Sequence, residues 1–159
     1  MSDDVDVPES HPRYESLLTR HRIEAGVDRG ITSRQGLIAQ GRGEAYDYLL
    51  GERTIDTADR AERAAAAHLL EADNAVVSVN GNAAALAPGE LVELSEATGA
   101  ALEVNLFNRT EERIEAIVDY LREHGAEDVK GLDADGRIPG IDHERAKVDA
   151  DGIGDADVV

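Results

Sequence analysis

The second half of the chain alternates short apolar runs with stretches of helical spacing, and this alternation limits the possible folds more than any other feature. The runs at 75–79 and 101–107 have the composition of strands, and a third strand is predicted near 128–132. Strands that alternate with helices along a chain favour parallel βαβ units. We therefore predict an α/β fold in which residues 74–159 form a Rossmann-like, three-layer sheet of mainly parallel strands.

The first half of the chain is predicted to be helical, after an acidic tail that is expected to be disordered. The expected helices cover about 10–28, then the stretch from the capping pair Thr32 and Gln35 to about Gly51, and then about 56–72. The expected domains are therefore the tail (1–9), a helical segment (10–73) and the α/β core (74–159).

The last residues, 154–159, have the composition of the beginning of a buried strand. A parallel sheet seldom ends on half a strand at the terminus of a protein. We therefore expect this polypeptide to be a C-terminally truncated part of a longer protein, with an incomplete sheet.

The second predicted helix carries an arginine in its apolar stripe. That stripe is expected to face inward and consists of Ile38, Arg42, Ala45 and Leu49. A glycine stands on each side of Arg42, although glycine costs about 1 kcal/mol relative to alanine inside a helix. A ligand that approaches the backbone closely would explain both glycines, and the guanidinium would bind its phosphate or carboxylate. The alternative is a buried ion pair of Arg42 with Glu44 or Glu52. On the first helix, Arg13 and Arg20 lie two turns apart, which suits an anion contact or a solvated basic face.

Polar side chains follow the first two predicted strands. Asn80 and Asn82 flank a glycine after the first strand, and Asn105 and Arg109 lie at the end of the second. In open α/β sheets, ligands bind outside the carboxyl ends of the strands. These residues therefore predict a polar ligand site, with a plain turn at the asparagines and a helix cap with surface ion pairs as the alternative.

Acidic residues dominate the charge of the chain. There are 34 Asp and Glu against 16 Lys and Arg, and the net charge of -18 would repel nucleic acid, so no nucleic-acid partner is expected. The acids are spread along the chain, which favours a halophilic source. No basic leader or long apolar run is present, so we expect a cytoplasmic protein without a membrane partner. The chain has no cysteine, and its histidines lack the spacing of metal ligands. His21 and His68 are expected to pack in the core, and no metal site is predicted.

Several long segments of the sequence carry a resemblance to a known family. They read SHPRYESL, GLIAQGRGEAYDYLLGERT, VVSVNGNAAAL, LEVNLFNRTEERIEAI and RIPGIDHERAKVDADGIGDADVV. These segments resemble archaeal phosphopantothenate synthetases, which are also called 4-phosphopantoate–β-alanine ligases, and the resemblance runs from about Ser10 to Val159.

The resemblance implies a ligase of coenzyme A biosynthesis. ATP, 4-phosphopantoate and β-alanine would give 4'-phosphopantothenate, AMP and diphosphate, and AMP as a product suggests an acyl-adenylate. The resemblance also implies a homodimer with a Rossmann-like core, in which Arg20 and Arg42 contact ATP. Mg²⁺ is expected to accompany ATP, although no protein ligand set for it is visible. No catalytic residue is identified.

From their strand-end position, and not from the resemblance, we assign Asn80, Asn82, Asn105 and Arg109 to phosphopantoate. The resembling family continues beyond Val159. This polypeptide alone is therefore expected to be inactive, and the alternative function is a noncatalytic anion-binding or dimerisation module left by truncation.

Overall fold

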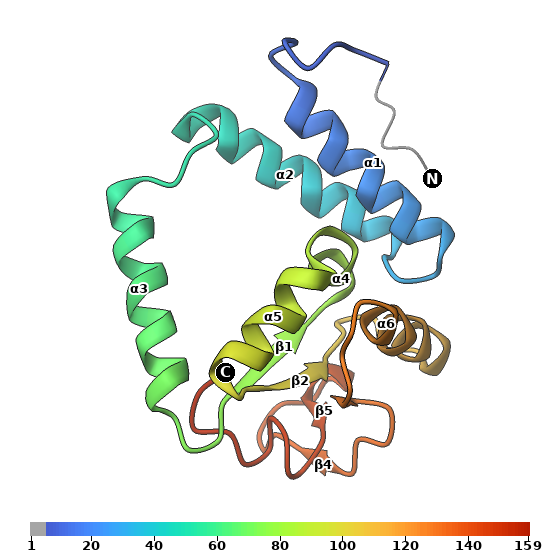
Figure 1. Ribbon diagram of the computed structural model, residues 1–159. Helices are drawn as coiled ribbons and strands as arrows, with labels where there is room; N and C mark the ends of the chain where they lie inside the picture. The colour runs from blue at the N-terminus through green and yellow to red at the C-terminus, as the bar shows by residue number, and fades with distance from the viewer. Residues whose placement is uncertain (1–5) are drawn as a thin grey trace.

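The computed structural model describes residues 6–159 (Figure 1), so part of the tail expected to be disordered, residues 1–5, lies outside the described residues. The helical segment contains α1 (Tyr14–Asp28), α2 (Arg34–Leu50) and α3 (Asp56–Glu71). The core contains β1 (Val76–Val79), α4 (Gly81–Leu86), α5 (Pro88–Thr98), β2 (Ala101–Val104), α6 (Glu111–Glu123), β3 (Val129–Lys130), β4 (Gly136–Arg137), the 3-10 helix η1 (Glu144–Ala146) and β5 (Lys147–Val148). The predicted α/β class, with helices first and a parallel sheet after them, is confirmed.

The main sheet places β2 between β1 and β3, and all three strands are parallel. Successive side chains of a strand point to opposite faces. Leu102 and Val104 of β2 therefore pack in the hydrophobic core together with side chains of α5 and α6. The antiparallel pair of β4 and β5 forms a second, small sheet in the segment that follows β3.

Glu103, the residue of β2 that faces away from this core, is a fully buried carboxylate. Its Oε1 accepts a hydrogen bond from the backbone N–H of Asp149 at 3.0 Å, and its Oε2 accepts one from Ile153 at 2.7 Å. A side chain at Gly152 would collide with the same carboxylate, so the backbone must come close there. Burial raises the pKa of Glu103 although both hydrogen bonds oppose the change. This carboxylate fastens the segment around residues 149–153 to the second face of the sheet.

The predicted helices of the core form as expected. Pro88 begins α5, and Gly99 ends it with a φ of 74°. At α6, the hydroxyl of Thr110 accepts a hydrogen bond from the backbone N–H of Arg113 at 3.3 Å and caps the helix. The predicted inner stripe of α6 is buried and consists of Ile114, Ile117, Val118 and Leu121. The strand expected over 154–159 is present as a single parallel bridge between Val158 and Ala75.

Three local predictions are wrong. Helix α1 begins at Tyr14 and not near residue 10. The capping box at the start of α2 is absent, because the hydroxyl of Thr32 donates instead to the carbonyl oxygen of Gly81 at 3.0 Å. The turn expected after β1 is the start of α4, since the side-chain oxygen of Asn80 accepts hydrogen bonds from the backbone N–H groups of Asn82 and Ala83.

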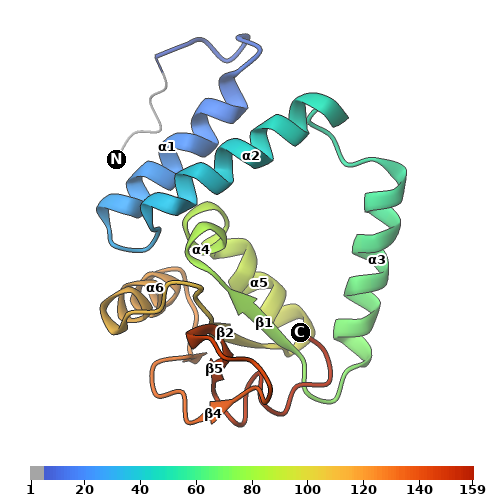
Figure 2. The same cartoon turned by 180° about the vertical axis from the view of Figure 1, so that it is seen from behind.

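The apolar stripes predicted for α2 and α3 do not face the interior of the described chain. On α2, Ile38 is 61% exposed and Leu49 is 82% exposed, whereas the buried side chain is that of Glu44. Helix α3 has no buried residue, and both views show it standing apart from the sheet (Figures 1 and 2). His21 and His68 are likewise exposed, so the prediction that they pack in the core is wrong. Among residues 6–159, none of the helices combines the length and apolar character needed to cross a bilayer.

We expect Glu103→Ala to lower the free energy of unfolding by about 2–5 kcal/mol, because two partly buried N–H groups lose their acceptor and a void is left where the buried side chain was. Urea denaturation followed by circular dichroism measures the change. Glu103→Gln is the matched control and should lose less, since its amide oxygen can still accept one of the two hydrogen bonds. An unchanged midpoint for Glu103→Ala would show that the carboxylate does not hold this segment.

Candidate functional site

One buried carboxylate joins α1 to α2. Glu44 is 7% exposed, and its Oε2 accepts a hydrogen bond from Nη2 of Arg20 at 2.7 Å. Its Oε1 accepts one from Arg13 at 3.0 Å and one from the hydroxyl of Tyr48 at 2.6 Å. We call these four residues the Glu44 cluster. The hydrogen bond from Tyr48 and the two arginines lower the pKa of Glu44 from 4.5 to about 2, against the effect of burial.

The Glu44 cluster keeps a net positive charge, because two guanidinium groups surround one carboxylate. The side chain of Arg20 is 37% exposed and that of Arg13 is 47% exposed, so both reach solvent while Glu44 holds them in place. Arginines that are oriented before a ligand arrives lose less entropy when they bind it. The cluster is therefore suited to bind phosphate or carboxylate oxygens.

Arg42 lies outside the Glu44 cluster. It is exposed, and the ion pair with Glu44 that the sequence left open is absent because Glu44 binds Arg13 and Arg20. Two residues rotate a helix by about 200°, so Arg42 points away from Glu44 and from α1. Arg20 and Arg42 therefore lie on different sides of α2. At Gly41 and Gly43 an added methyl group would meet nothing within 4 Å, so the backbone beside Arg42 is open.

The start of α4, at Asn80 to Asn82, contacts the loop between α1 and α2 and the first turn of α2. Asn80 caps α4 through its side-chain oxygen, and Asn82 donates to the carbonyl oxygen of Gly36 at 3.0 Å. A side chain at Gly81 would collide with the carbonyl oxygen of Ile31. The asparagines thus have structural hydrogen bonds at the predicted ligand edge, and Asn80 remains exposed there.

Two arginines at the start of α6 donate to backbone oxygens. Arg109 donates to the carbonyl oxygen of Gly131 at 2.7 Å. Arg113 donates to the carbonyl oxygens of Asn108 at 2.6 Å and Ile31 at 3.1 Å, and its buried Nε has no partner among the described residues. Burial lowers the pKa of Arg113. These guanidinium groups are oriented by neutral acceptors, so their charge is not cancelled locally.

Asn105 is buried and does not point into open solvent. Its side-chain Nδ2 donates to the carbonyl oxygen of Arg145 at 2.9 Å, and its Oδ1 accepts from Nε of the same arginine at 3.0 Å. No local pattern in the sequence indicates Arg145, because 40 residues separate it from Asn105. The roles of Glu44 and Tyr48 were not predicted either, although their i, i+4 spacing on one helix was a usable signal.

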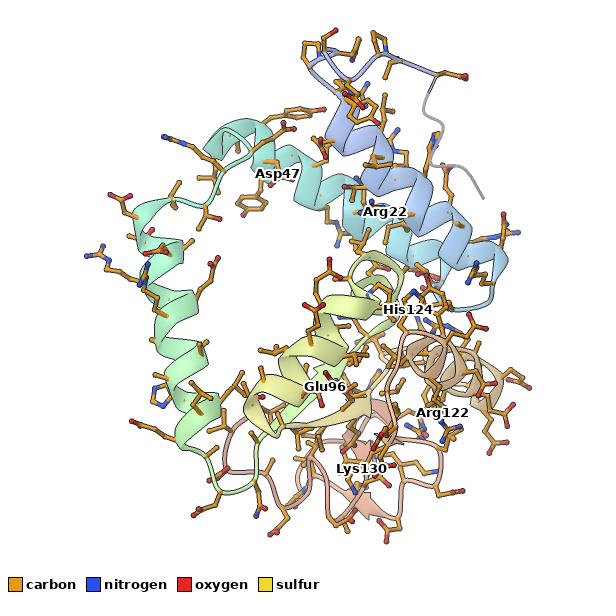
Figure 3. The ribbon with its side chains drawn as sticks, in the orientation of Figure 1. Arg22, Asp47, Glu96, Arg122, His124 and Lys130 are labelled. Atoms are coloured by element: carbon orange, nitrogen blue, oxygen red, sulfur yellow. The ribbon has the colours of Figure 1, made fainter. Side chains whose placement is uncertain are left out.

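A further hollow of about 630 Å³ lies between α1, the start of α5 and the end of α6, where Figure 3 labels Arg22 and His124. Its lining mixes charges of both signs, including Arg29 and Glu90. Within residues 6–159, no group of three or more His, Cys, Asp or Glu side chains is arranged to hold a metal ion.

Comparisons with known proteins identify relatives over nearly the whole chain. A family model described as phosphopantothenate/pantothenate synthetase matches residues 57–159. A 4-phosphopantoate–β-alanine ligase from Thermococcus onnurineus is 57% identical over 156 residues, which is 98% of this chain and 60% of that protein. Proteins of the same name from Methanosarcina mazei and Methanospirillum hungatei are 55% and 52% identical, over 98% and 96% of this chain and 61% and 62% of their own lengths. The chain thus spans about three fifths of the length of these curated relatives.

We expect Glu44→Gln to lower the free energy of unfolding at pH 7 by about 1–3 kcal/mol, because the arginines lose a charged acceptor. The pKa of Glu44 lies below its ordinary value of 4.5, so its contribution is complete above that pH and is lost as pH falls through about 2. The difference between wild type and variant should shrink over this range. Denaturant titrations at stepped pH measure it, with Glu115→Gln at an exposed position of α6 as control. A difference that does not change with pH would contradict the assignment.

Proposed function

Because this chain belongs to the phosphopantothenate/pantothenate synthetase family, we propose that the protein joins 4-phosphopantoate to β-alanine at the expense of ATP. The products are 4'-phosphopantothenate, AMP and diphosphate, as in coenzyme A biosynthesis. The observation that carries this proposal is the identity of 52–57% to proteins named 4-phosphopantoate–β-alanine ligase. Since the chain spans about 60% of those relatives, the activity is proposed for the protein expressed from its full reading frame. A noncatalytic module is not favoured, because the relatives are named as ligases.

The proposed chemistry needs fixed positive charge more than a protein nucleophile. A carboxylate oxygen of phosphopantoate attacks the α-phosphorus of ATP and releases diphosphate. The amine of β-alanine then attacks the acyl carbon, loses a proton, and expels AMP as the amide bond forms. Negative charge develops at phosphate oxygens in the first step and on the acyl oxygen in the second, and positioned donors stabilise both. Mg²⁺ is proposed to enter with ATP, bound mainly by phosphate oxygens and water.

Arg20 and Arg42 are the proposed contacts of the ATP phosphates. The net positive charge of the Glu44 cluster supports the assignment of Arg20. The open backbone of Gly41 and Gly43 supports the assignment of Arg42. For phosphopantoate, the exposed Asn80 and the guanidinium of Arg109 are the proposed contacts at the strand ends. Asn82 and Asn105 are proposed to act indirectly, because their side-chain amides already donate to the carbonyl oxygens of Gly36 and Arg145 and so hold these segments in place.

We propose that the protein is a homodimer and that its interface includes the end of α2 and the length of α3. Large apolar side chains are exposed along this region, with Tyr46 at 67%, Leu49 at 82% and Leu70 at 64%. Helix α3 buries none of its residues within one chain, although it has an apolar stripe. Exposed apolar surface of this kind is typical of protein interfaces. A second subunit would also supply groups on the side of α2 where Arg42 points.

We propose that the protein is cytoplasmic and comes from a halophilic organism whose cytoplasm is rich in salt. The net charge of -18 is spread along the chain, and high ionic strength screens the repulsion between its carboxylates.

AMP and diphosphate should be released only when ATP, 4-phosphopantoate and β-alanine are all present with the protein from the full reading frame. Arg42→Ala should lower kcat/KM for ATP by about 10–100-fold, which corresponds to the loss of a charged hydrogen bond. A coupled AMP assay in high salt measures both effects. Arg122→Ala is the matched control, because Arg122 is a half-exposed arginine of α6, outside the proposed interface, that pairs with Asp119 on the surface. Unchanged kinetics of Arg42→Ala would remove this residue from the ATP site.

Leu49→Glu should shift the protein from dimer to monomer, because a charge is placed in the proposed interface. Sedimentation velocity across a range of concentrations measures the change. Ile141→Glu is the control, since Ile141 is also exposed but lies in the core segment after β4. A wild-type protein that stays monomeric at all concentrations would refute the dimer.

A further inference from the structure

The hairpin of α1 and α2 is attached to the core through the loop between these two helices, which lies beside α4 in both views (Figures 1 and 2). Side-chain hydrogen bonds cross this junction in both directions. The hydroxyl of Thr32 in the loop donates to the carbonyl oxygen of Gly81 at 3.0 Å. From the core, Nη2 of Arg113 donates to the carbonyl oxygen of Ile31 at 3.1 Å, and Asn82 donates to the first turn of α2.

The chain segments at this junction are in direct contact. A side chain at Gly81 would collide with the carbonyl oxygen of Ile31, and one at Gly36 would collide with the side-chain oxygen of Asn82. Ile31 itself is 1% exposed and packs in the hydrophobic core. Closely packed interiors transmit displacements and do not absorb them. The orientation of the hairpin relative to the core is therefore set by contacts at this loop.

Arg113 supplies the cation of the junction, and burial makes that charge costly. Its Nη1 donates to the carbonyl oxygen of Asn108 at 2.6 Å, and its buried Nε has no partner within residues 6–159. Burial lowers the pKa of Arg113, and no carboxylate of the described residues forms an ion pair with it. A hydrocarbon side chain of similar length would fill the same space without this cost. The guanidinium therefore contributes through the direction of its donors and not through packing.

The two segments that Arg113 connects carry the proposed contacts of different substrates. One is the hairpin with Arg20 and Arg42, and the other is the segment that follows β2. Attack of the phosphopantoate carboxylate on the α-phosphorus of ATP requires the reacting atoms to lie about 3–3.5 Å apart, and a misplacement of about 1 Å costs roughly 100-fold in rate. The separation of the two substrates thus depends on the junction that Arg113 holds.

We infer that Arg113 is a positioning residue of the ligase, which holds the α1–α2 hairpin at a fixed place relative to the segment after β2 so that the two bound substrates can react. This inference rests on the proposed function. A loosened hairpin can still adapt to either substrate alone, so Arg113 governs the reaction of the two together more than the binding of each.

Arg113→Met in the protein from the full reading frame tests the inference, because methionine keeps the length and removes the donors. The kcat should fall about 10–100-fold, while the Kd values for ATP and for 4-phosphopantoate, measured separately by calorimetry, change less than about threefold. Arg113→Lys should recover part of the rate, since an ammonium group can still reach one carbonyl oxygen. Arg122→Met is the matched control, because Arg122 lies on the same helix and pairs with Asp119 on the surface (Figure 3).

Three kinetic results would overturn the inference. An unchanged kcat would show that Arg113 does not position the substrates. A Kd for phosphopantoate that alone rises more than about tenfold would make Arg113 a direct ligand. A loss of rate that only matches a lower fraction of folded protein, measured by circular dichroism, would leave a purely structural role. If Arg113→Met does not fold, Thr32→Val replaces it, because it removes another hydrogen bond of the junction and should lower kcat with the same retention of both Kd values.

Hydrogen exchange followed by mass spectrometry tests the attachment of the hairpin without an activity assay. Backbone amides in the peptide over residues 29–36 should exchange about tenfold faster in Arg113→Met than in the wild type, and should not change in Arg122→Met. Equal exchange in the wild type and Arg113→Met would overturn the inference. If the wild type forms no phosphopantothenate, the proposed function fails and the exchange still decides whether Arg113 holds the hairpin. If the wild type is active and Arg113→Met is unimpaired, only this inference fails.

Discussion

The polar side chains at the carboxyl ends of the strands are brought together by the parallel pairing of β1 with β2. Val76 pairs with Ala101 and Val79 with Val104, so both strands end on the same side of the sheet. The start of α4, which follows β1, contacts the loop between α1 and α2, and Asn105, which follows β2, forms hydrogen bonds with Arg145. An antiparallel pair would have sent these segments to opposite edges, and the cations of α6 and η1 would not have a common surface.

Four arginines of the chain are oriented by two kinds of acceptor, and the two kinds leave different net charges at the guanidinium groups. Arg13 and Arg20 share the carboxylate of Glu44, so half of their charge is cancelled where they bind. Arg109 and Arg145 donate to carbonyl and amide oxygens, which orient a guanidinium and leave its whole charge available. In a chain with 34 acidic side chains, arginines without a carboxylate partner are a local reversal of the overall charge. This contrast supports small anions as the ligands of the strand edge.

Local signals predicted the elements of the core well, because a cap and a stripe that belong to one helix are readable along the sequence. Thr110 and the buried face of α6 are examples. The stripes of α2 and α3 were misread, since a stripe identifies a face but not what covers it. The capping box at Thr32 failed because a contact with Gly81, 49 residues away, uses the hydroxyl. The role of Arg145 could not be predicted for the same reason, because its position depends on a contact with a residue far away in the sequence.

The burial of Glu44 has a consequence for how the protein responds to high salt. At 1 M salt the distance over which mobile ions shield a charge is about 3 Å, so an exposed pair such as Arg63 with Asp59 loses most of its attraction. Counterions cannot enter between a carboxylate that is 7% exposed and the guanidinium groups in direct contact with it. The ion pairs that connect α1 to α2 are therefore weakened by salt much less than exposed ion pairs are.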